Sequence, residues 1–270
     1  MLCTIETHRE YTGLYKEWPR DTALIIGSFV AIKLLLHFLT SGGYGYFRDE
    51  LYYLVCGSRL DWGYVDHPPL TPLLARLSGD VFGQTTFAVR FFPAVLGAVT
   101  IVIAALMARE LGAKRFGIFL TCLAMLVAPH YLASQSKLAT DSIEPPFWAG
   151  CAYLLLRAIR EQGPKYWIGI GIVAGLGFEA KHSIIFYVAA LLLGLLITPQ
   201  RRLLWNWYFI AGALIALSLA LPNLIWEWRH HWATYELLSN ISHSKKNVVL
   251  GPLTFLTQQL LILGPLTAPV

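Results

Sequence analysis

Runs of apolar residues close to the thickness of a lipid bilayer limit what this chain can fold into more than any other feature. A helix needs about 20 consecutive apolar residues to cross the hydrocarbon core of a bilayer. Such runs, some of them slightly shorter, occur at about 22–40, 88–108, 116–133, 143–159, 166–180, 183–198, 203–225 and 252–270. The pattern predicts an all-α, polytopic membrane protein with about eight transmembrane helices.

The composition agrees with this interpretation and argues against the common soluble classes. Charged residues make up 14% of the 270 residues, whereas soluble domains carry about 25%. The net charge of +5 is accounted for by basic loops, so we expect no nucleic-acid partner. The four cysteines are scattered without a CxxC pair or a Cys/His cluster. We therefore expect neither a disulfide framework nor a zinc site of Cys and His.

The positions of Lys and Arg predict the orientation of the spans, because cytoplasmic loops of membrane proteins are enriched in both residues. Every second segment between the spans is short and basic. These segments hold Arg9, Lys16 and Arg20, then Arg109, Lys114 and Arg115, then Arg157, Arg160 and Lys165, and then Arg201 and Arg202. We predict a cytoplasmic N-terminal segment, 1–21, and a multi-pass domain, 22–270, whose acidic residues lie mostly outside.

The segment 41–87 is the longest predicted outer loop, and it carries apolar residues at helical spacing. Thr71 and Pro72 predict a helix start, with Thr71 as the N-cap and Pro72 at the first position. One apolar stripe follows, at Leu73, Leu74, Leu77 and Val81. We expect this helix to lie in the membrane interface, although a helix packed against the spans gives the same pattern.

Two adjacent acids, Asp49 and Glu50, follow the first span. On a helix, Asp49 shares one face with Tyr52, Tyr53 and Cys56, whereas Glu50 points about 100° away. One carboxylate can then face a substrate while the other holds a metal or an Arg. The alternative is a solvated helix start, where acids are favoured by the positive end of the helix dipole.

Three further outer segments combine charged residues with Pro or Gly. Asp66 and His67 precede two prolines, which fix how both side chains are presented; a simple turn is the alternative. Asp141 begins a stretch that fits a capping box with Glu144. Lys181 ends the segment 175–181 and suits either a lipid phosphate or an anchor that reaches the interface.

These segments place Asp, Glu, His and Lys at the outer ends of several spans. A transporter more often carries polar groups near the membrane midplane, where only Lys33 lies. We interpret Lys33 as a lysine buried between helices or reaching the interface, with a functional role as the alternative. The pattern favours a catalytic site at the outer interface over a permease.

The ordered set of motifs resembles the bacterial members of the dolichyl-phosphate-mannose–protein mannosyltransferase superfamily. These are GT-C-type membrane glycosyltransferases, and they include the aminoarabinose transferases that act on lipid A. The resemblance rests on the segments 47–53 (FRDELYY), 64–70 (YVDHPPL), 139–142 (ATDS), 175–181 (GLGFEAK) and 221–228 (LPNLIWEW). It covers about 40–270, nearly the whole chain.

The resemblance implies a transferase in the inner membrane that takes a sugar from a polyprenyl-phosphate donor. The sugar passes, with inversion, to a lipid, glycan or protein acceptor outside the cytoplasm. Asp49 is then the base that deprotonates the acceptor hydroxyl. Arg48 and Lys181 are the candidates for stabilising the leaving phosphate, and Asp141 orients the sugar or the acceptor.

The other substrate-binding candidates under this resemblance are Glu50, Tyr53 and His67. Glu50 and His67 are also the candidate ligands of a divalent metal; no other cofactor is implied, and membrane lipids are the remaining partners.

Two other functions fit the same residues. A non-catalytic protein that binds or flips a lipid-linked sugar needs the cavity but no base, and a small-molecule transporter needs facing polar groups at midplane depth. Relatives of this type usually continue through several more spans, whereas this chain ends inside the run 252–270. We therefore expect a truncated product, a fragment or a shortened paralogue.

Overall fold

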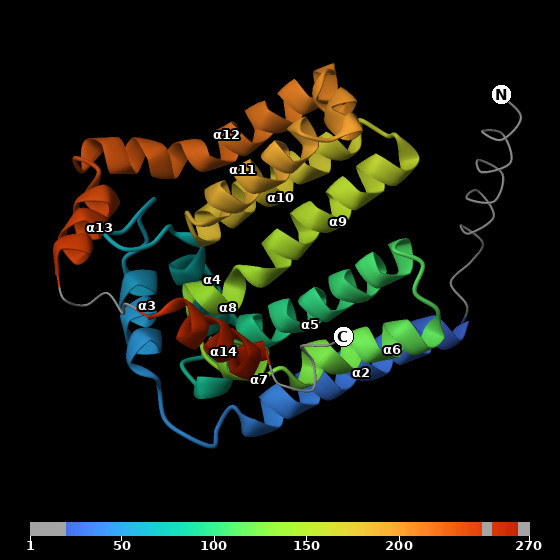
Figure 1. Cartoon of the computed structure of the whole chain (residues 1–270). Coiled ribbons are helices and arrows are strands. Elements are labelled where there is room, and N and C mark those ends of the chain that lie inside the picture. Colours follow the sequence, from blue (N-terminus) through green and yellow to red (C-terminus); the bar gives the residue numbers. More distant parts are fainter. Residues whose placement is uncertain (1–19, 245–249, 264–270) are drawn as a thin grey trace, which may run out of the picture.

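The computed structural model describes residues 20–244 and 250–263, and this part of the chain is helical without a strand. The helices are α2 (Arg20–Thr40), α3 (Arg48–Ser58), α4 (Leu70–Phe82), α5 (Thr86–Glu110), α6 (Arg115–Val127), α7 (Pro129–Ser134), α8 (Thr140–Ile143), α9 (Pro145–Glu161), α10 (Tyr166–Ala180), α11 (Ile184–Leu196), the 3₁₀ helix η2 (Pro199–Leu204), α12 (Trp207–Arg229), α13 (Ala233–His243) and α14 (Pro252–Leu263). The long helices run along a shared direction, and the short helices α3, α4, α8 and α13 gather at one end of them (Figure 1).

Three of the described helices, α2, α5 and α12, are long and apolar enough to cross a membrane. The helices α6, α10 and α11 are apolar but shorter. Each of the eight predicted runs contains a helix, so the all-α class is confirmed, whereas the number of about eight spans is not. The ends of the predicted segments, 1–19 and 264–270, lie outside the described residues, as do 245–249.

Local sequence signals explain where the longest helices begin and where one predicted span is broken. Thr85 accepts a hydrogen bond from the Ala88 N–H at 3.1 Å to cap α5, and Asn206 caps α12 in the same way. The predicted run 116–133 is wrong as one span, because Ala128 is extended and α7 starts anew at Pro129. A residue before proline is driven out of the helical conformation, which explains the break.

The helix α4 begins at Leu70, so the prediction of Thr71 as its N-cap is wrong. Pro72 falls in the first turn, where a missing N–H costs nothing. The small and polar Thr71, Ala75 and Ser78 are buried. Of the predicted apolar stripe, Leu73, Leu77 and Val81 are exposed, Val81 to 70%, whereas Leu74 packs against buried side chains. An apolar face left open beside the spans agrees with a helix that lies in the membrane interface.

The helices α10 and α12 approach closely at two glycines. A Cβ atom on Gly171 would clash with the carbonyl oxygen of Gly212, and one on Gly212 would clash with the carbonyl oxygen of Trp167. Small residues permit such close backbone contact between membrane helices. This tight pair holds the end of α10, and hence Lys181, in place relative to α12.

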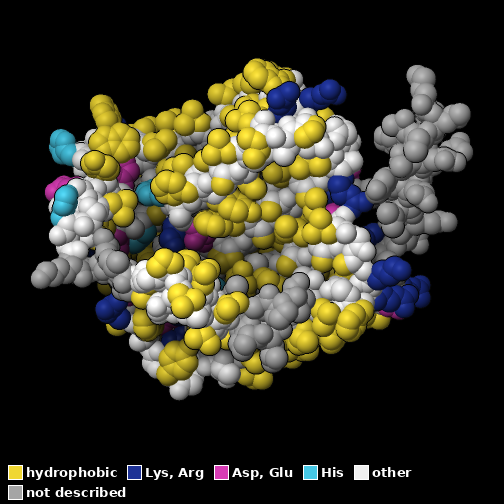
Figure 2. Space-filling model, viewed as in Figure 1, with side chains coloured by type: hydrophobic (Ala, Val, Ile, Leu, Met, Phe, Trp, Pro, Cys, Tyr) yellow, Lys and Arg dark blue, Asp and Glu magenta, His cyan; other side chains and the backbone are white. Residues whose placement is uncertain are grey.

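Charged residues separate between the two ends of the bundle. Asp21 pairs with Arg115 at 2.6 Å, and Glu110 pairs with Arg160 at 3.3 Å, both at the end where most Lys and Arg lie. Figure 2 shows this basic end on the right, with most of the visible His side chains on the left.

Lys33 is buried between helices and donates to the Tyr131 carbonyl at 3.4 Å, which confirms the structural interpretation of this residue.

Candidate active site at the end that holds α3 and α8

Asp49 lies in the first turn of α3 at the surface of the molecule. Its side chain is 37% exposed, and its Oδ1 lies 3.1 Å from Nε of Arg48, which is 88% exposed. The helix starts here because the Phe47 N–H donates to Oε2 of Glu50 at 2.8 Å, closing the first turn. The Asp49 carboxylate is therefore partly exposed, whereas the Glu50 carboxylate is buried. This difference agrees with the predicted separation of about 100° between neighbours on a helix.

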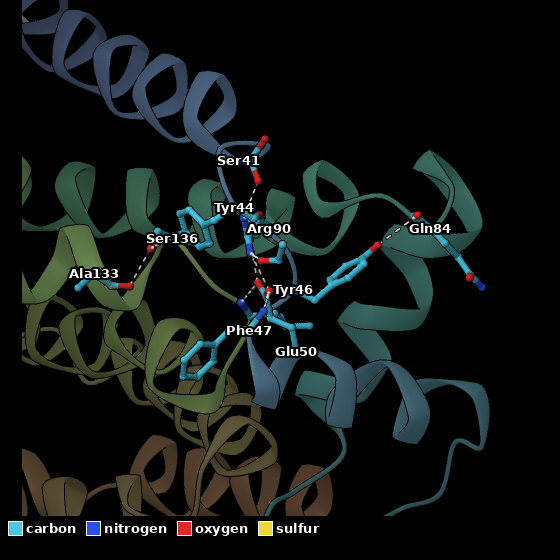
Figure 3. Close-up of polar contacts among 11 residues, drawn as sticks. Ser41, Tyr44, Tyr46, Phe47, Glu50, Gln84, Arg90, Ala133 and Ser136 are labelled. Carbon is cyan, nitrogen blue, oxygen red and sulfur yellow. Dashed lines mark hydrogen bonds and ion pairs between the residues drawn. The ribbon is translucent and has the colours of Figure 1, made fainter.

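Glu50 is enclosed and forms an ion pair with Arg90 on α5. Arg90 Nε lies 2.9 Å from Oε1 of Glu50, and its second terminal nitrogen lies 2.9 Å from Oε2. The same guanidinium donates to the carbonyl oxygens of Ser41 and Gly45, as Figure 3 shows in part. The N–H of Leu138 donates to Oε1 of Glu50 at 3.1 Å. One buried pair thus joins α3, α5, the segment after α2 and the segment before α8.

These contacts change the role of Glu50 from the one that the sequence suggested. Its carboxylate is fully buried and engaged with protein groups, so it positions its neighbours in place of binding a substrate or a metal. The sequence predicted that the acid turned away from the substrate holds a metal or an Arg. In the structure this acid is Glu50, and its partner is Arg90. Sequence reasoning missed Arg90, although an arginine inside the run 88–108 is costly without a partner and could have been recognised by that criterion.

Tyr53 links the segments that carry the candidate residues. Its ring belongs to a buried cluster with Ala75 of α4, Val89 of α5, Ala139 before α8 and Ala180 at the end of α10, together with Leu138 and Ile143. Ala180 directly precedes Lys181, and Ala139 lies two residues before Asp141. Burial raises the pKa of Tyr53 to about 12, while the neighbouring Thr140 acts in the opposite direction. Tyr53 is therefore protonated and acts mainly as a packing residue.

His67 is buried among three tyrosines. Its ring centroid lies 4.7–5.4 Å from those of Tyr52, Tyr53 and Tyr64. Nδ1 donates to the Pro68 carbonyl at 3.0 Å. Burial lowers the pKa of His67, so the neutral ring is favoured with its lone pair on Nε2. This Nε2 has no hydrogen-bond partner within the described structure.

The lone pair of His67 faces the carboxylate of Asp66. Nε2 lies 3.7 Å from Oδ1 of Asp66, and the same oxygen accepts a hydrogen bond from the Tyr52 hydroxyl at 2.6 Å. A neutral nitrogen and a carboxylate oxygen are both acceptors, which suits a bridging donor or cation. Within 20–244 and 250–263, however, no three His, Cys, Asp or Glu side chains gather as metal ligands, and Glu50 is taken up by Arg90. Glu50 is therefore not free to complete a metal site with His67.

Asp141 lines a pocket of about 330 Å³ formed by the segment after α2, by α7 and by the start of α8. The lining residues are Tyr44, Phe47, His130, Ala133, Ser134, Ser136, Lys137 and Asp141. Asp141 does not form the predicted capping box with Glu144. That arrangement is made by Ser142, which accepts from the Ala139 N–H at 3.1 Å and donates back to the Ala139 carbonyl, so the Asp141 carboxylate is released for the pocket.

Lys181 forms an ion pair with Glu144 at the outer start of α9. Its Nζ lies 3.3 Å from Oε2 of Glu144, and the Ser183 hydroxyl donates to the other oxygen. The side chain of Lys181 is still 39% exposed. The next residue, His182, contacts Oδ1 of the buried Asn223 on α12 at 2.9 Å, and Asn223 donates to the Trp62 carbonyl at 2.8 Å. Asn223 is a second residue that sequence reasoning did not single out.

The predicted site residues therefore share one end of the molecule but do not line the same pocket. Asp141 lines the pocket, whereas Asp49 and Lys181 are not among its lining residues. Phe47, two residues before Asp49, is the link between the pocket and α3. The buried cluster around Tyr53 and the Glu50–Arg90 pair hold these parts together.

A match to a model of a known protein family shows to which family this chain is related. The family model described as dolichyl-phosphate-mannose-protein mannosyltransferase matches residues 66–226, more than half of the chain. The chain belongs to this family. The mannosyltransferase-family match spans the Asp66–His67 turn, Asp141, Lys181 and Asn223, and it begins after α3.

Curated relatives extend the likeness of this mannosyltransferase-family chain to its N-terminal part. It is 27% identical over 256 residues, 92% of its length, to a lipid A galacturonosyltransferase of Rhizobium johnstonii. It is also 27% identical over 62% of its length to an undecaprenyl phosphate-α-4-amino-4-deoxy-L-arabinose arabinosyl transferase of Pseudomonas aeruginosa. The chain covers 52% and 31% of these two relatives. No solved structure matches it.

Proposed function

We propose that this chain contributes the membrane domain of a glycosyltransferase. The enzyme moves a sugar, with inversion, from a polyprenyl-phosphate donor to an acceptor hydroxyl on the outer face of the inner membrane. A lipid acceptor is favoured over a glycan or protein, since one relative's name specifies lipid A. The observation that carries the proposal is the contrast between Asp49 and Glu50: the exposed acid lies beside a buried ion pair that fixes its helix.

The chemistry needs a base, an electrophile and a stabilised leaving group. Asp49 takes the proton of the acceptor hydroxyl while that oxygen attacks the anomeric carbon of the donor sugar. The bond from this carbon to the phosphate oxygen breaks, and its electron pair leaves with the polyprenyl phosphate. Arg48, with its exposed guanidinium, and Lys181 supply the positive charge that this phosphate requires.

Asp141 and the pocket that it lines hold the sugar or the acceptor. Tyr53 and Glu50 keep α3 in place, and His67 fixes the turn between α3 and α4. These roles follow from burial: Glu50 and His67 are enclosed, whereas Asp49 and Asp141 retain access to solvent.

The membrane arrangement is part of the proposal. We infer that residues 22–270 form one transmembrane domain, in which α6, α9, α10, α11 and α14 accompany the three long spans. The end with α3, α4 and α8 faces away from the cytoplasm, because the opposite end carries the short basic loops. The N-terminal segment then lies in the cytoplasm.

A direct test separates catalysis from mere binding of a lipid-linked sugar. Asp49→Asn removes the base and keeps the size of the side chain, so transfer from a polyprenyl-phosphate donor should fall while donor affinity is retained. Asp80→Asn is the matched control, since Asp80 is an exposed acid on α4 that pairs with Arg76. A protein that only binds or flips the donor would keep its activity in both variants, which would refute the transferase proposal.

A further inference from the structure

The pocket beside α7 contains two opposite charges that do not neutralise each other. Lys137 and Asp141 both line it, yet neither forms an ion pair within 4.0 Å with any described residue, nor with the other. Lys137 is half-buried, and its Nζ lies 4.6 Å from the centre of the Phe47 ring. Two half-buried charges of opposite sign that line one pocket without an ion pair provide separate contacts for a ligand that carries both an anionic group and donors.

The lining of this pocket also carries a hydroxyl without a partner. Ser134 is 4% exposed, and its Oγ has no hydrogen-bond partner among the described residues. Buried polar atoms are almost always paired, so an unpaired one at a pocket surface indicates a ligand or a water. In contrast, the neighbouring Ser136 is satisfied, because it donates to the Ala133 carbonyl at 2.9 Å and accepts from the Tyr44 hydroxyl at 3.3 Å (Figure 3).

The pocket is also held rigidly by the buried ion pair. The Arg90 guanidinium lies 4.4 Å from the centre of the Tyr44 ring and donates to the Tyr44 and Gly45 carbonyl oxygens. Phe47 is the N-cap residue of α3, and its N–H donates to Glu50. Arg90 therefore holds Tyr44 at the pocket, and Glu50 holds the backbone of Phe47. Aromatic faces of this kind pack well on sugar rings.

We propose that this pocket binds a sugar unit that carries an anionic substituent, a carboxylate or a phosphate. Lys137 contacts the anion, Ser134 and Asp141 contact the ring hydroxyls, and the rings of Tyr44 and Phe47 form the apolar wall. The ammonium of a lysine suits either anion as a point charge, and His130 lies on the same lining. The inference rests on the proposed function. It states that the enzyme handles an anionic sugar in preference to a neutral or an amino sugar.

Binding of four simple probes to the purified full chain tests this inference. The probes are glucuronic acid, glucose 1-phosphate, glucose and glucosamine, and their dissociation constants are obtained by saturation-transfer NMR titration. At least one anionic probe should bind about tenfold more tightly than glucose, which corresponds to about 1.4 kcal/mol. Preference for glucuronic acid assigns the anion to a carboxylate, and preference for glucose 1-phosphate assigns it to a phosphate.

Variants of Lys137 assign the preference to the pocket. Lys137→Gln should abolish it, whereas Lys137→Arg, which keeps the charge and guards against a folding defect, should retain it. Lys114→Gln, an exposed lysine at the start of α6, is the control and should change nothing. Affinity for glucose or glucosamine that matches or exceeds the affinity for both anionic probes, or an unchanged preference in Lys137→Gln, would overturn the inference.

The outcome is independent of the test for catalysis. Lys137-dependent anion binding in a protein whose Asp49→Asn variant transfers sugar normally would refute the proposed base and leave the pocket assignment intact. Loss of transfer in Asp49→Asn together with charge-independent probe binding would refute the pocket assignment alone.

Discussion

The guanidinium of Arg90 and the carboxylate of Glu50, 40 residues apart in sequence, meet in the interior through two contacts of 2.9 Å each. This pair anchors the helix that presents Asp49, and Glu50 also accepts the Leu138 N–H just before the segment that presents Asp141. The geometry of the candidate site therefore depends on residues that are buried in the interior.

Removal of one partner of this pair should destabilise the protein strongly. Arg90→Met leaves the Glu50 carboxylate buried and uncompensated, and breaking such a pair costs about 3–5 kcal/mol. We expect a clearly lower midpoint of thermal unfolding in detergent. The double variant Glu50→Gln/Arg90→Met removes both charges and should recover part of the loss. A single variant as stable as the parent would show that the pair is dispensable.

The contact between α10 and α12 predicts that alanine substitutions at two glycines differ sharply in their effect on stability. Gly171→Ala places a Cβ atom against the Gly212 carbonyl, and overpacking of this kind costs about 1–3 kcal/mol. Gly194→Ala on α11 meets open space and should not destabilise. Thermal unfolding of both variants measures the difference, and equal behaviour would mean that α10 and α12 are not in close contact.

Tyr53 predicts a loss of stability at alkaline pH. Its folded pKa, raised by burial to about 12, exceeds the ordinary value of 10.0. The unfolded chain therefore releases this proton first, and the stabilisation is complete below pH 10 and lost as the pH rises to about 12. The slope contributed by one proton is at most about 1.4 kcal/mol per pH unit.

Denaturant unfolding at several pH values tests the role of Tyr53. Tyr53→Phe should flatten the decline in the unfolding free energy between about pH 10 and pH 12, compared with the exposed control Tyr235→Phe. An identical decline in both variants would argue against a buried, protonated Tyr53.

Much of the fold follows from hydropathy, because a helix in every apolar run is the only way to satisfy the backbone in lipid. The break before Pro129 could have been predicted from the proline, which hydropathy alone ignores. Which face of α4 is buried depends on the helices that pack beside it. Asp49, Asp141 and Lys181 could be assigned to one end from their positions between spans. Arg90 stands out locally as an arginine inside an apolar run. Its partner Glu50, like His182, the partner of Asn223, is distant in sequence, so neither pairing could be predicted.

The orientation of the two ends is open to chemical labelling. In a background without the native cysteines, Ser58→Cys at the end of α3 should react with a membrane-impermeant maleimide from outside. Lys114→Cys, in the basic turn before α6, should react only after the membrane is opened. Reaction of both cysteines from the same side would contradict the topology and the outer location of the site.

Turnover of folded Asp49→Asn protein tests the central claim most directly. We predict a loss of at least about 10²-fold in sugar transfer from the polyprenyl-phosphate donor, the range expected for removal of a general base, with an unchanged midpoint of thermal unfolding because Asp49 is a surface residue. The buried neighbour variant Glu50→Gln, assayed in parallel, should instead lower the unfolding midpoint. Near-normal transfer by Asp49→Asn would contradict the assignment of Asp49 as the catalytic base.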